Sequence, residues 1–192
     1  MENDQAPAES GKLLLHMGFF GNDYISMART STSMANLERC LSGLLKATNA
    51  TAVIVPISIA PDLIPFIKGL NFALRYFARN IAEALPTEWE KLLARKSRQH
   101  PGVKFYSYDH AALLRSAASG TLEYIPRRLI SDGYCLKTMP DKTETVCANP
   151  QNHLFWDLAH PSSIIHKAMA DAITDFLHTG TSHFGRIFHT PN

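Results

Sequence analysis

The chain has 192 residues, of which 45% are hydrophobic and 19% are charged, with a formal net charge of +2 at pH 7. These values are typical of one globular domain and exclude an intrinsically disordered chain. Acidic and basic residues are mixed along the sequence, which argues against a nucleic-acid-binding protein, and no apolar run is long enough to form a transmembrane segment.

Strands and helices alternate along the predicted chain. Apolar, β-branched runs predict buried strands, and apolar residues spaced three and four apart predict helices. The expected elements are a strand at 12–18, a helix at 33–48, a strand at 51–58, a helix at 69–99, a strand at 103–109, a helix at 110–119, an irregular loop at 120–153 and a helix at 161–178. This alternation predicts an α/β fold with a mostly parallel sheet, whose active site would lie outside the carboxyl ends of the strands.

Particular residues refine the three long helices. Ser33 is expected to cap the first helix. Pro86 should kink or restart the second, because proline lacks the backbone N–H that a helix needs. Pro161 suits the first turn of the last helix. The apolar face of the first helix is expected to comprise Leu37, Leu41, Leu44 and Leu45.

The three cysteines differ in their surroundings. Cys135 and Cys147 lie in one loop-like segment, which indicates either a loop-closing disulfide or two reduced thiols in a cytosolic protein. Cys40 lies in a helical pattern and is expected to be an inert core residue. A disulfide implies export, whereas residues 1–10 have neither the basic start nor the apolar stretch of a signal peptide. A missing N-terminus would reconcile these two observations.

The segment HLFWDLAHPSS at 153–163 has the clearest chemical pattern. Asp157 and His160 are three residues apart, so a turn would allow the carboxylate to reach one imidazole nitrogen. The other nitrogen would then be free to act as a general base. The alternative is a helix cap with a nearby surface histidine, because Asp-x-x-His alone is a weak signal.

A second polar segment, GFFGNDYI, directly follows the first predicted strand at residues 18–25. The amide of Asn22 is able to donate a hydrogen bond to a developing oxyanion, and Gly21 would permit a close approach of the backbone. The alternative is an ordinary turn, because glycine, asparagine and aspartate are common turn residues.

Together the two segments resemble the GDSL, or SGNH, family of ester hydrolases. The string GNDY is similar to the Gly-x-Asn-Asp block of that family, and FWDLAHPS is similar to its closing block. The intervening VPISIAP, QHPGVKFYSYD and cysteine-containing segments resemble the lipase branch, which includes thermolabile haemolysins and phospholipases. The resemblance covers residues 12–178; residues 1–11 are then expected to be a disordered or linker remnant and residues 179–192 a C-terminal tail.

The resemblance implies a three-layer α/β/α sandwich that lacks its N-terminal strand or strands. It implies that Asn22 is an oxyanion donor, that His160 is the base and that Asp157 orients His160. The reaction would be acyl transfer through a serine ester, with a lipid or small ester as substrate and without a metal or organic cofactor. The full-length protein is expected to be secreted or periplasmic.

The nucleophile block of the family does not occur in these 192 residues, which contain no Gly-Asp-Ser string. The expectation is therefore a partial chain, inactive alone, whose missing N-terminal segment is supplied in cis or in trans. Ser58 ends a predicted strand but has no glycine elbow after it. Ser162 and Ser163 adjoin His160 but fit better as the start of a helix.

Two alternatives to a hydrolase fragment remain open from the sequence. The first is a non-catalytic lipid- or ester-binding protein of the same fold. The second is an unrelated α/β domain with chance matches to the family motifs. Some apolar residues would line an acyl pocket or belong to ordinary core and loop packing. They are Phe19, Phe20, Ile59, Pro61 and Pro65.

Overall fold

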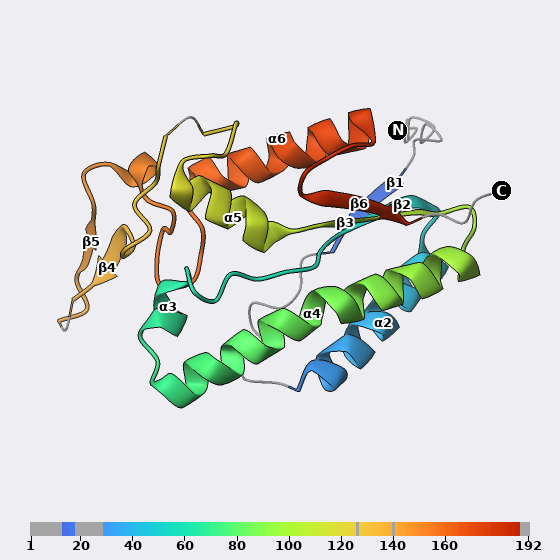
Figure 1. Cartoon of the computed structure of the whole chain (residues 1–192), viewed down its shortest axis with the longest axis horizontal. Coiled ribbons are helices and arrows are strands. Elements are labelled where there is room, and N and C mark those ends of the chain that lie inside the picture. The colour runs from blue at the N-terminus through green and yellow to red at the C-terminus, as the bar shows by residue number, and fades with distance from the viewer. Residues whose placement is uncertain (1–12, 18–28, 126, 140, 189–192) are drawn as a thin grey trace, which may run out of the picture.

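The structure is a computed structural model that describes residues 13–17, 29–125, 127–139 and 141–188. It contains helices and strands in the alternating order expected from the sequence (Figure 1). They are β1 (Leu13–His16), α2 (Thr30–Ala47), β2 (Ala50–Pro56), α3 (Pro65–Lys68), α4 (Phe72–Gln99), β3 (Lys104–Tyr108), α5 (His110–Ser119), β4 (Leu136–Thr138), β5 (Glu144–Val146), η1 (Pro150–Asn152), α6 (Ser163–Thr179) and β6 (Gly185–Phe188).

A mostly parallel sheet of four strands, in the order β1-β2-β3-β6, forms the centre of the molecule. Strand β2 pairs in parallel with β1 and with β3, whereas β6 pairs antiparallel with β3. The predicted mixed α/β fold with a mostly parallel sheet is therefore confirmed. The carboxyl ends of β1, β2 and β3 lie along one edge, which is where such sheets place ligands.

Strand β6 was not predicted, because the sequence after residue 178 shows no sustained apolar period. It pairs with β3 from Phe105–Phe188 to Tyr108–Gly185. Gly185 packs so closely on α6 that a Cβ atom there would lie 2.5 Å from the ring of Phe176. This close approach explains why a glycine begins the strand.

Successive side chains of the central strands point to opposite faces of the sheet, and a layer of helices covers each face. Val53, Val55 and Phe105 belong to the cluster that α2 and α4 cover, and each is 0% exposed. Ile54 and Tyr106 point to the other face and pack with Phe176 of α6. Figure 1 shows α2 and α4 on one side of the sheet and α5 and α6 on the other. The middle of β2 is thus buried on both faces, which agrees with its nearly continuous apolar sequence.

Helix α2 begins earlier than the sequence indicated, at Thr30, so Ser33 lies inside the helix and is not its cap. Ser33, Leu37 and Leu41 form its buried stripe. Cys40 is exposed, so the prediction that it lies in the core was wrong. It precedes the buried Leu41 by one residue, and one residue along a helix turns the side chain by about 100°, away from the buried stripe. Leu44 is likewise 36% exposed.

Helix α4 runs without interruption through Pro86, so the helix does not restart there. Its buried face includes Leu85, Trp89 and Leu93, each at most 1% exposed. Burial of these large side chains offsets the hydrogen bond that Pro86 cannot donate. Asn71 caps the helix and accepts a hydrogen bond from the backbone N–H of Leu74 at 3.0 Å.

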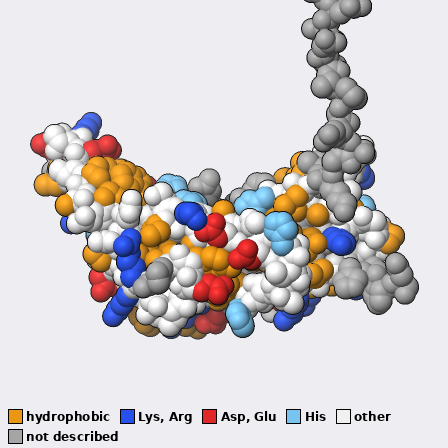
Figure 2. Space-filling view, turned by 90° about the horizontal axis from the view of Figure 1, so that it is seen from above, with side chains coloured by type: hydrophobic (Ala, Val, Ile, Leu, Met, Phe, Trp, Pro, Cys, Tyr) orange, Lys and Arg blue, Asp and Glu red, His pale blue; other side chains and the backbone are white. Residues whose placement is uncertain are grey.

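The segment expected to be an irregular loop, 120–153, contains the short antiparallel hairpin β4–β5 and the 3-10 turn η1. Cys135 and Cys147 form a disulfide at the base of this hairpin, as one of the two sequence interpretations predicted. Hydrophobic side chains gather at this end of the molecule (Figure 2). They include Met139 and Val146, which are 45% and 54% exposed.

Substitution of Leu41 by alanine tests the packing of α2. We expect a loss of about 2–5 kcal/mol in the free energy of unfolding, because Leu41 is 0% exposed. Leu44→Ala, on the same helix but 36% exposed, should cost less than about 1 kcal/mol. Urea unfolding of both variants measures the difference, and equal losses would contradict the described face of α2.

Candidate functional site

The loop between η1 and α6 brings Asp157 and His160 together. The Nδ1 atom of His160 lies 2.8 Å from Oδ2 and 3.0 Å from Oδ1 of the Asp157 carboxylate. The same carboxylate accepts hydrogen bonds from the backbone N–H groups of Ala159, at 2.8 Å, and of His160, at 2.7 Å. One carboxylate therefore holds both the backbone of the loop and the imidazole ring.

Backbone contacts close this loop and attach it to the rest of the fold. Trp156 donates its N–H to the carbonyl of His160 at 2.8 Å, and Phe155 forms an antiparallel bridge with Pro161. Phe66 of α3 donates to the carbonyl of Leu158 at 2.8 Å. Because α3 belongs to the segment that follows β2, the Asp157–His160 loop is joined to the carboxyl side of the sheet.

Hydrogen bonding favours the ionised form of Asp157. Burial opposes ionisation, but the N–H groups of Ala159 and His160 and the His160 side chain outweigh it and lower the pKa of Asp157. Asp157 carries its charge at neutral pH and accepts the Nδ1–H of His160, which leaves Nε2 as the basic nitrogen. The His160 side chain is 76% exposed, so Nε2 is accessible to a ligand.

The disulfide hairpin supports the loop from its other side. Cys135 donates its N–H to the carbonyl of Trp156 at 3.0 Å, and Leu136 donates to the same carbonyl at 2.6 Å. Cys147 donates in turn to the carbonyl of Cys135 at 3.1 Å. A covalently closed hairpin therefore contacts the residue next to Asp157.

The second predicted segment falls outside the described residues. Gly21 and Asn22, and with them Phe19 and Phe20, belong to residues 18–28, and the geometry between Asn22 and His160 remains a prediction. His16, which ends β1, is described and shows where that segment leaves the sheet.

The serine residues near the carboxyl edge have structural roles. Ser58 is 7% exposed; its hydroxyl donates to the carboxylate of Asp109 and accepts the N–H of Ala111 at 2.9 Å. Ser58 therefore joins the end of β2 to the start of α5. Ser162 is the N-cap residue of α6 and is 2% exposed, and its hydroxyl has no hydrogen-bond partner within the described part of the chain. Neither geometry resembles a serine activated by His160.

A cluster of aromatic and imidazole rings near the same edge was not predicted. The rings of His16 and Tyr108 stack with centroids 6.2 Å apart, and Tyr108 meets His110 edge-on at 6.4 Å. Burial raises the pKa of Tyr108 to about 12. Burial, with a contribution from His166, lowers the pKa of His110 to about 4.

His110 has an unusual environment within this cluster. Its Nε2 atom is buried and has no hydrogen-bond partner among the residues that the structure describes. His110 directly follows the predicted strand at 103–109, whereas His16 lies inside the predicted strand at 12–18, so no common sequence signal marked the cluster.

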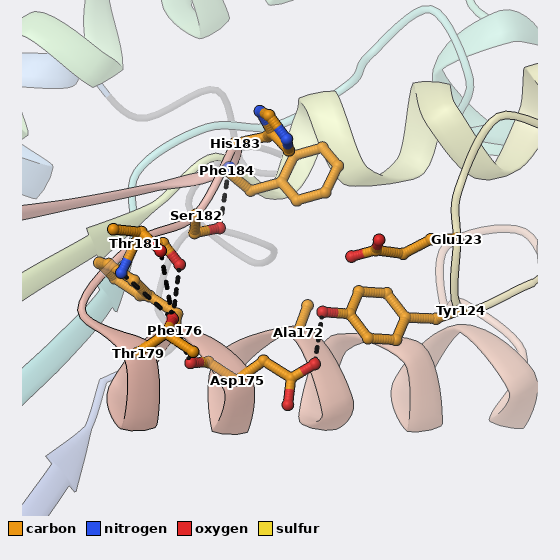
Figure 3. Close-up of a pocket in the computed structure, with 10 residues that line it drawn as sticks. All are labelled: Glu123, Tyr124, Ala172, Asp175, Phe176, Thr179, Thr181, Ser182, His183 and Phe184. Carbon is orange, nitrogen blue, oxygen red and sulfur yellow. Dashed lines mark hydrogen bonds between the residues drawn. The ribbon is translucent and has the colours of Figure 1, made fainter.

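The two hollows described next, in the part of the chain that the structure describes, do not include Asp157 or His160. One hollow, of about 430 Å³, lies between the C-terminal half of α6 and the segments that contain Tyr124 and Phe184 (Figure 3). Tyr124 donates to the carboxylate of Asp175 at 2.8 Å there, and burial followed by that hydrogen bond raises the pKa of Tyr124. Another hollow, of about 440 Å³, is lined by Ile59 and Pro61 together with Ser58.

Within the described ranges, no group of three or more histidine, cysteine, aspartate or glutamate side chains is arranged to hold a metal ion. Among the same residues, no helix combines the length and the apolar character needed to cross a membrane.

The neutral form of His110 should contribute stability that is lost in mild acid. Because the fold lowers its pKa from 6.5 to about 4, this stability is present above pH 6.5 and disappears as the pH falls toward 4. We expect a loss of about 2–3 kcal/mol over that range. Urea unfolding of His110→Gln should show a smaller dependence on pH between 7 and 5.

His183→Gln removes an exposed histidine and is the matched control. It should keep the acid sensitivity of the unmodified protein. An unchanged pH dependence in His110→Gln would contradict the assigned burial of that ring.

Removal of the disulfide should loosen the hairpin that contacts the Asp157–His160 loop. Cys135→Ala/Cys147→Ala opens a covalent loop with a sequence separation of 12, for which we expect a loss of about 2–4 kcal/mol in unfolding free energy. Cys40→Ala, which removes the exposed thiol, is the control and should be nearly neutral. Urea unfolding under oxidising conditions measures both, and equal stability of the two variants would contradict a supporting role for the disulfide.

A scan against protein-family models and a search of curated proteins find no match to this sequence. The candidate site is an ionised aspartate that orients an exposed histidine, on a loop attached to the carboxyl side of a mostly parallel sheet.

Proposed function

We propose that the chain carries the acid–base part of an ester-hydrolase site of the GDSL, or SGNH, type. The observation that carries the proposal is the contact between Asp157 and His160, in which both carboxylate oxygens lie within 3.0 Å of Nδ1. This arrangement leaves Nε2 to take a proton from a nucleophile and to return it to the leaving alcohol. The position of the loop beside the segment that follows β2 supports the proposal.

In the proposed mechanism, Asp157 stabilises the imidazolium that forms when His160 accepts the proton. The side-chain amide of Asn22 would donate to the oxyanion of the tetrahedral intermediate. No metal or organic cofactor takes part in this mechanism, and the substrate would be a lipid or a small carboxylic ester. Because helices pack on both faces of the sheet, we further propose that the fold is the three-layer sandwich of that family.

The nucleophilic serine would be supplied by a segment outside these 192 residues, in cis or in trans. Two observations support this part of the proposal. The sequence has no Gly-Asp-Ser string, and the hydroxyl of Ser58 is already committed to Asp109 and Ala111. The disulfide agrees with an oxidising compartment, so we propose a secreted or periplasmic location for the complete enzyme.

A non-catalytic binding protein for lipids or esters is the second candidate function. The engaged hydroxyl of Ser58 favours it, because this serine is hydrogen-bonded to Asp109 and Ala111 and not to His160. Saturable binding of a short-chain ester without turnover, in the presence of the segment encoded upstream, would support this candidate over the hydrolase.

The hydrolase proposal predicts a strong effect of His160. In a protein that includes the upstream coding segment, His160→Ala should lower kcat for p-nitrophenyl butyrate by at least about a hundredfold, because the general base is lost. Asp157→Asn should also lower kcat, because the orienting charge is lost. His178→Ala, which removes an exposed histidine of α6, is the control and should retain full activity.

The same proposal requires Asn22 and His160 to face one cleft. A spin label on Asn22→Cys, in a Cys40→Ser background, should broaden the imidazole resonances of His160 more than those of His178. Equal broadening, or none at His160, would contradict the proposed site even if the chain binds esters.

A further inference from the structure

A basic hollow of about 260 Å³ lies between α3 and the N-terminal half of α4. We call it the basic hollow, and its lining consists of Pro61, Asp62, Ile67, Lys68, Arg75 and Arg79. Three of these six side chains are cationic and one is acidic. The hollow contains neither Asp157 nor His160, so whatever it binds does not require the proposed ester chemistry.

Two of its four charged side chains are already paired. Asp62 accepts two hydrogen bonds from Arg115, at 2.7 Å and 3.4 Å. Lys68 lies 3.1 Å from the carboxylate of Asp132. Arg75 makes no side-chain hydrogen bond or ion pair within the described residues, whereas Arg79 lies close enough to Asp62 to lower the pKa of that carboxyl. Asp62 is thus shared by Arg115 and Arg79, and the guanidinium group of Arg75 has no such partner among the described residues.

The two arginines are four residues apart on α4 and thus lie on the same helical face, where like charges repel each other. A bound oxyanion would relieve this repulsion. Planar guanidinium groups bind phosphate through pairs of parallel hydrogen bonds. A phosphomonoester, with nearly two negative charges at neutral pH, is attracted to the two guanidinium groups more strongly than a monoanion is.

The same helical face continues into exposed aromatic residues. Phe72 and Tyr76 are 76% and 60% exposed, and their rings stack with centroids 6.4 Å apart. Phe72, Arg75, Tyr76 and Arg79 follow the spacing i, i+3, i+4 and i+7, which places them on one stripe of the helix. An apolar group attached to a phosphate in the basic hollow would therefore have two aromatic rings beside it.

We propose that the basic hollow and this stripe of α4 form a binding site for a phosphomonoester that carries an apolar substituent. Arg75 and Arg79 bind the phosphate, and Lys68, which is paired with Asp132, lines the same hollow. Phe72 and Tyr76 pack against the apolar substituent. The ligand is either a soluble ester or the headgroup of a lipid, because the two share this chemistry.

Calorimetric titration with hexyl phosphate and with inorganic phosphate tests the site on the chain as it exists. Arg75→Gln/Arg79→Gln should weaken binding of hexyl phosphate by about tenfold or more, because charge-assisted hydrogen bonds are lost. Lys46→Gln/Arg98→Gln removes two exposed charges elsewhere and is the matched control. Equal weakening by both double variants, or by neither, would overturn the proposal.

Phe72→Ala/Tyr76→Ala tests the apolar half of the site. It should abolish the preference for hexyl phosphate over inorganic phosphate and leave the affinity for inorganic phosphate unchanged. A preference that survives would overturn the role of the aromatic pair. His160→Ala should bind hexyl phosphate normally, so a failure of the hydrolase proposal and a failure of this one are distinguishable.

Sedimentation with vesicles separates the two sources of the ligand. If vesicles that contain phosphatidic acid bind the chain, and Arg75→Gln/Arg79→Gln abolishes that binding, the site recognises a lipid headgroup. Binding of hexyl phosphate without sedimentation assigns the site to a soluble ester.

Discussion

The burial of β2 on both of its faces is the constraint on which the other elements depend. Val53, Ile54 and Val55 are consecutive, and all three are 0% exposed. Such a strand is stable only if a helical layer covers each face and a neighbouring strand satisfies each edge. The positions of α2 and α4 on one side, of α6 on the other, and of β1 and β3 at the edges follow from this requirement.

The same constraint positions the candidate site. The chain leaves β2 at its carboxyl end, and the hydroxyl of Ser58 ties this exit to the start of α5. It then forms α3, whose Phe66 holds the carbonyl of Leu158. The loop of Asp157 and His160 is thus attached to β2 through a short series of backbone and side-chain hydrogen bonds, which limits how far the imidazole can move.

Sequence patterns were sufficient to predict the strands and helices that have a sustained apolar pattern. The three parallel strands and the helices α2, α4, α5 and α6 were predicted, with boundaries that differ from the structure by a few residues. Strand β6 was missed because four residues on the edge of a sheet have too little apolar pattern to identify them. Pro86 suggested a break in α4 that the structure does not contain, because large buried side chains near it keep the helix continuous.

The candidate site was predictable only in part. The contact of Asp157 with His160 follows from their spacing in a turn, and the disulfide follows from two cysteines in one loop. The cluster around His110 was not predictable, because its members come from separate strands and helices and meet only in the folded chain. The lack of side-chain hydrogen bonds at Arg75 and Arg79 within the described residues was not predictable for the same reason, since such bonds depend on tertiary neighbours.

The exposed thiol of Cys40 has a practical consequence. Cys135 and Cys147 are joined to each other, so Cys40 is the odd cysteine of the chain, and it faces solvent on α2. In an oxidising solution such a group cross-links two molecules covalently, and a maleimide dye would couple to it selectively. Because Leu37 and Leu41 supply the packing of that helix, a fluorophore attached at Cys40 would report on the protein without entering its interior.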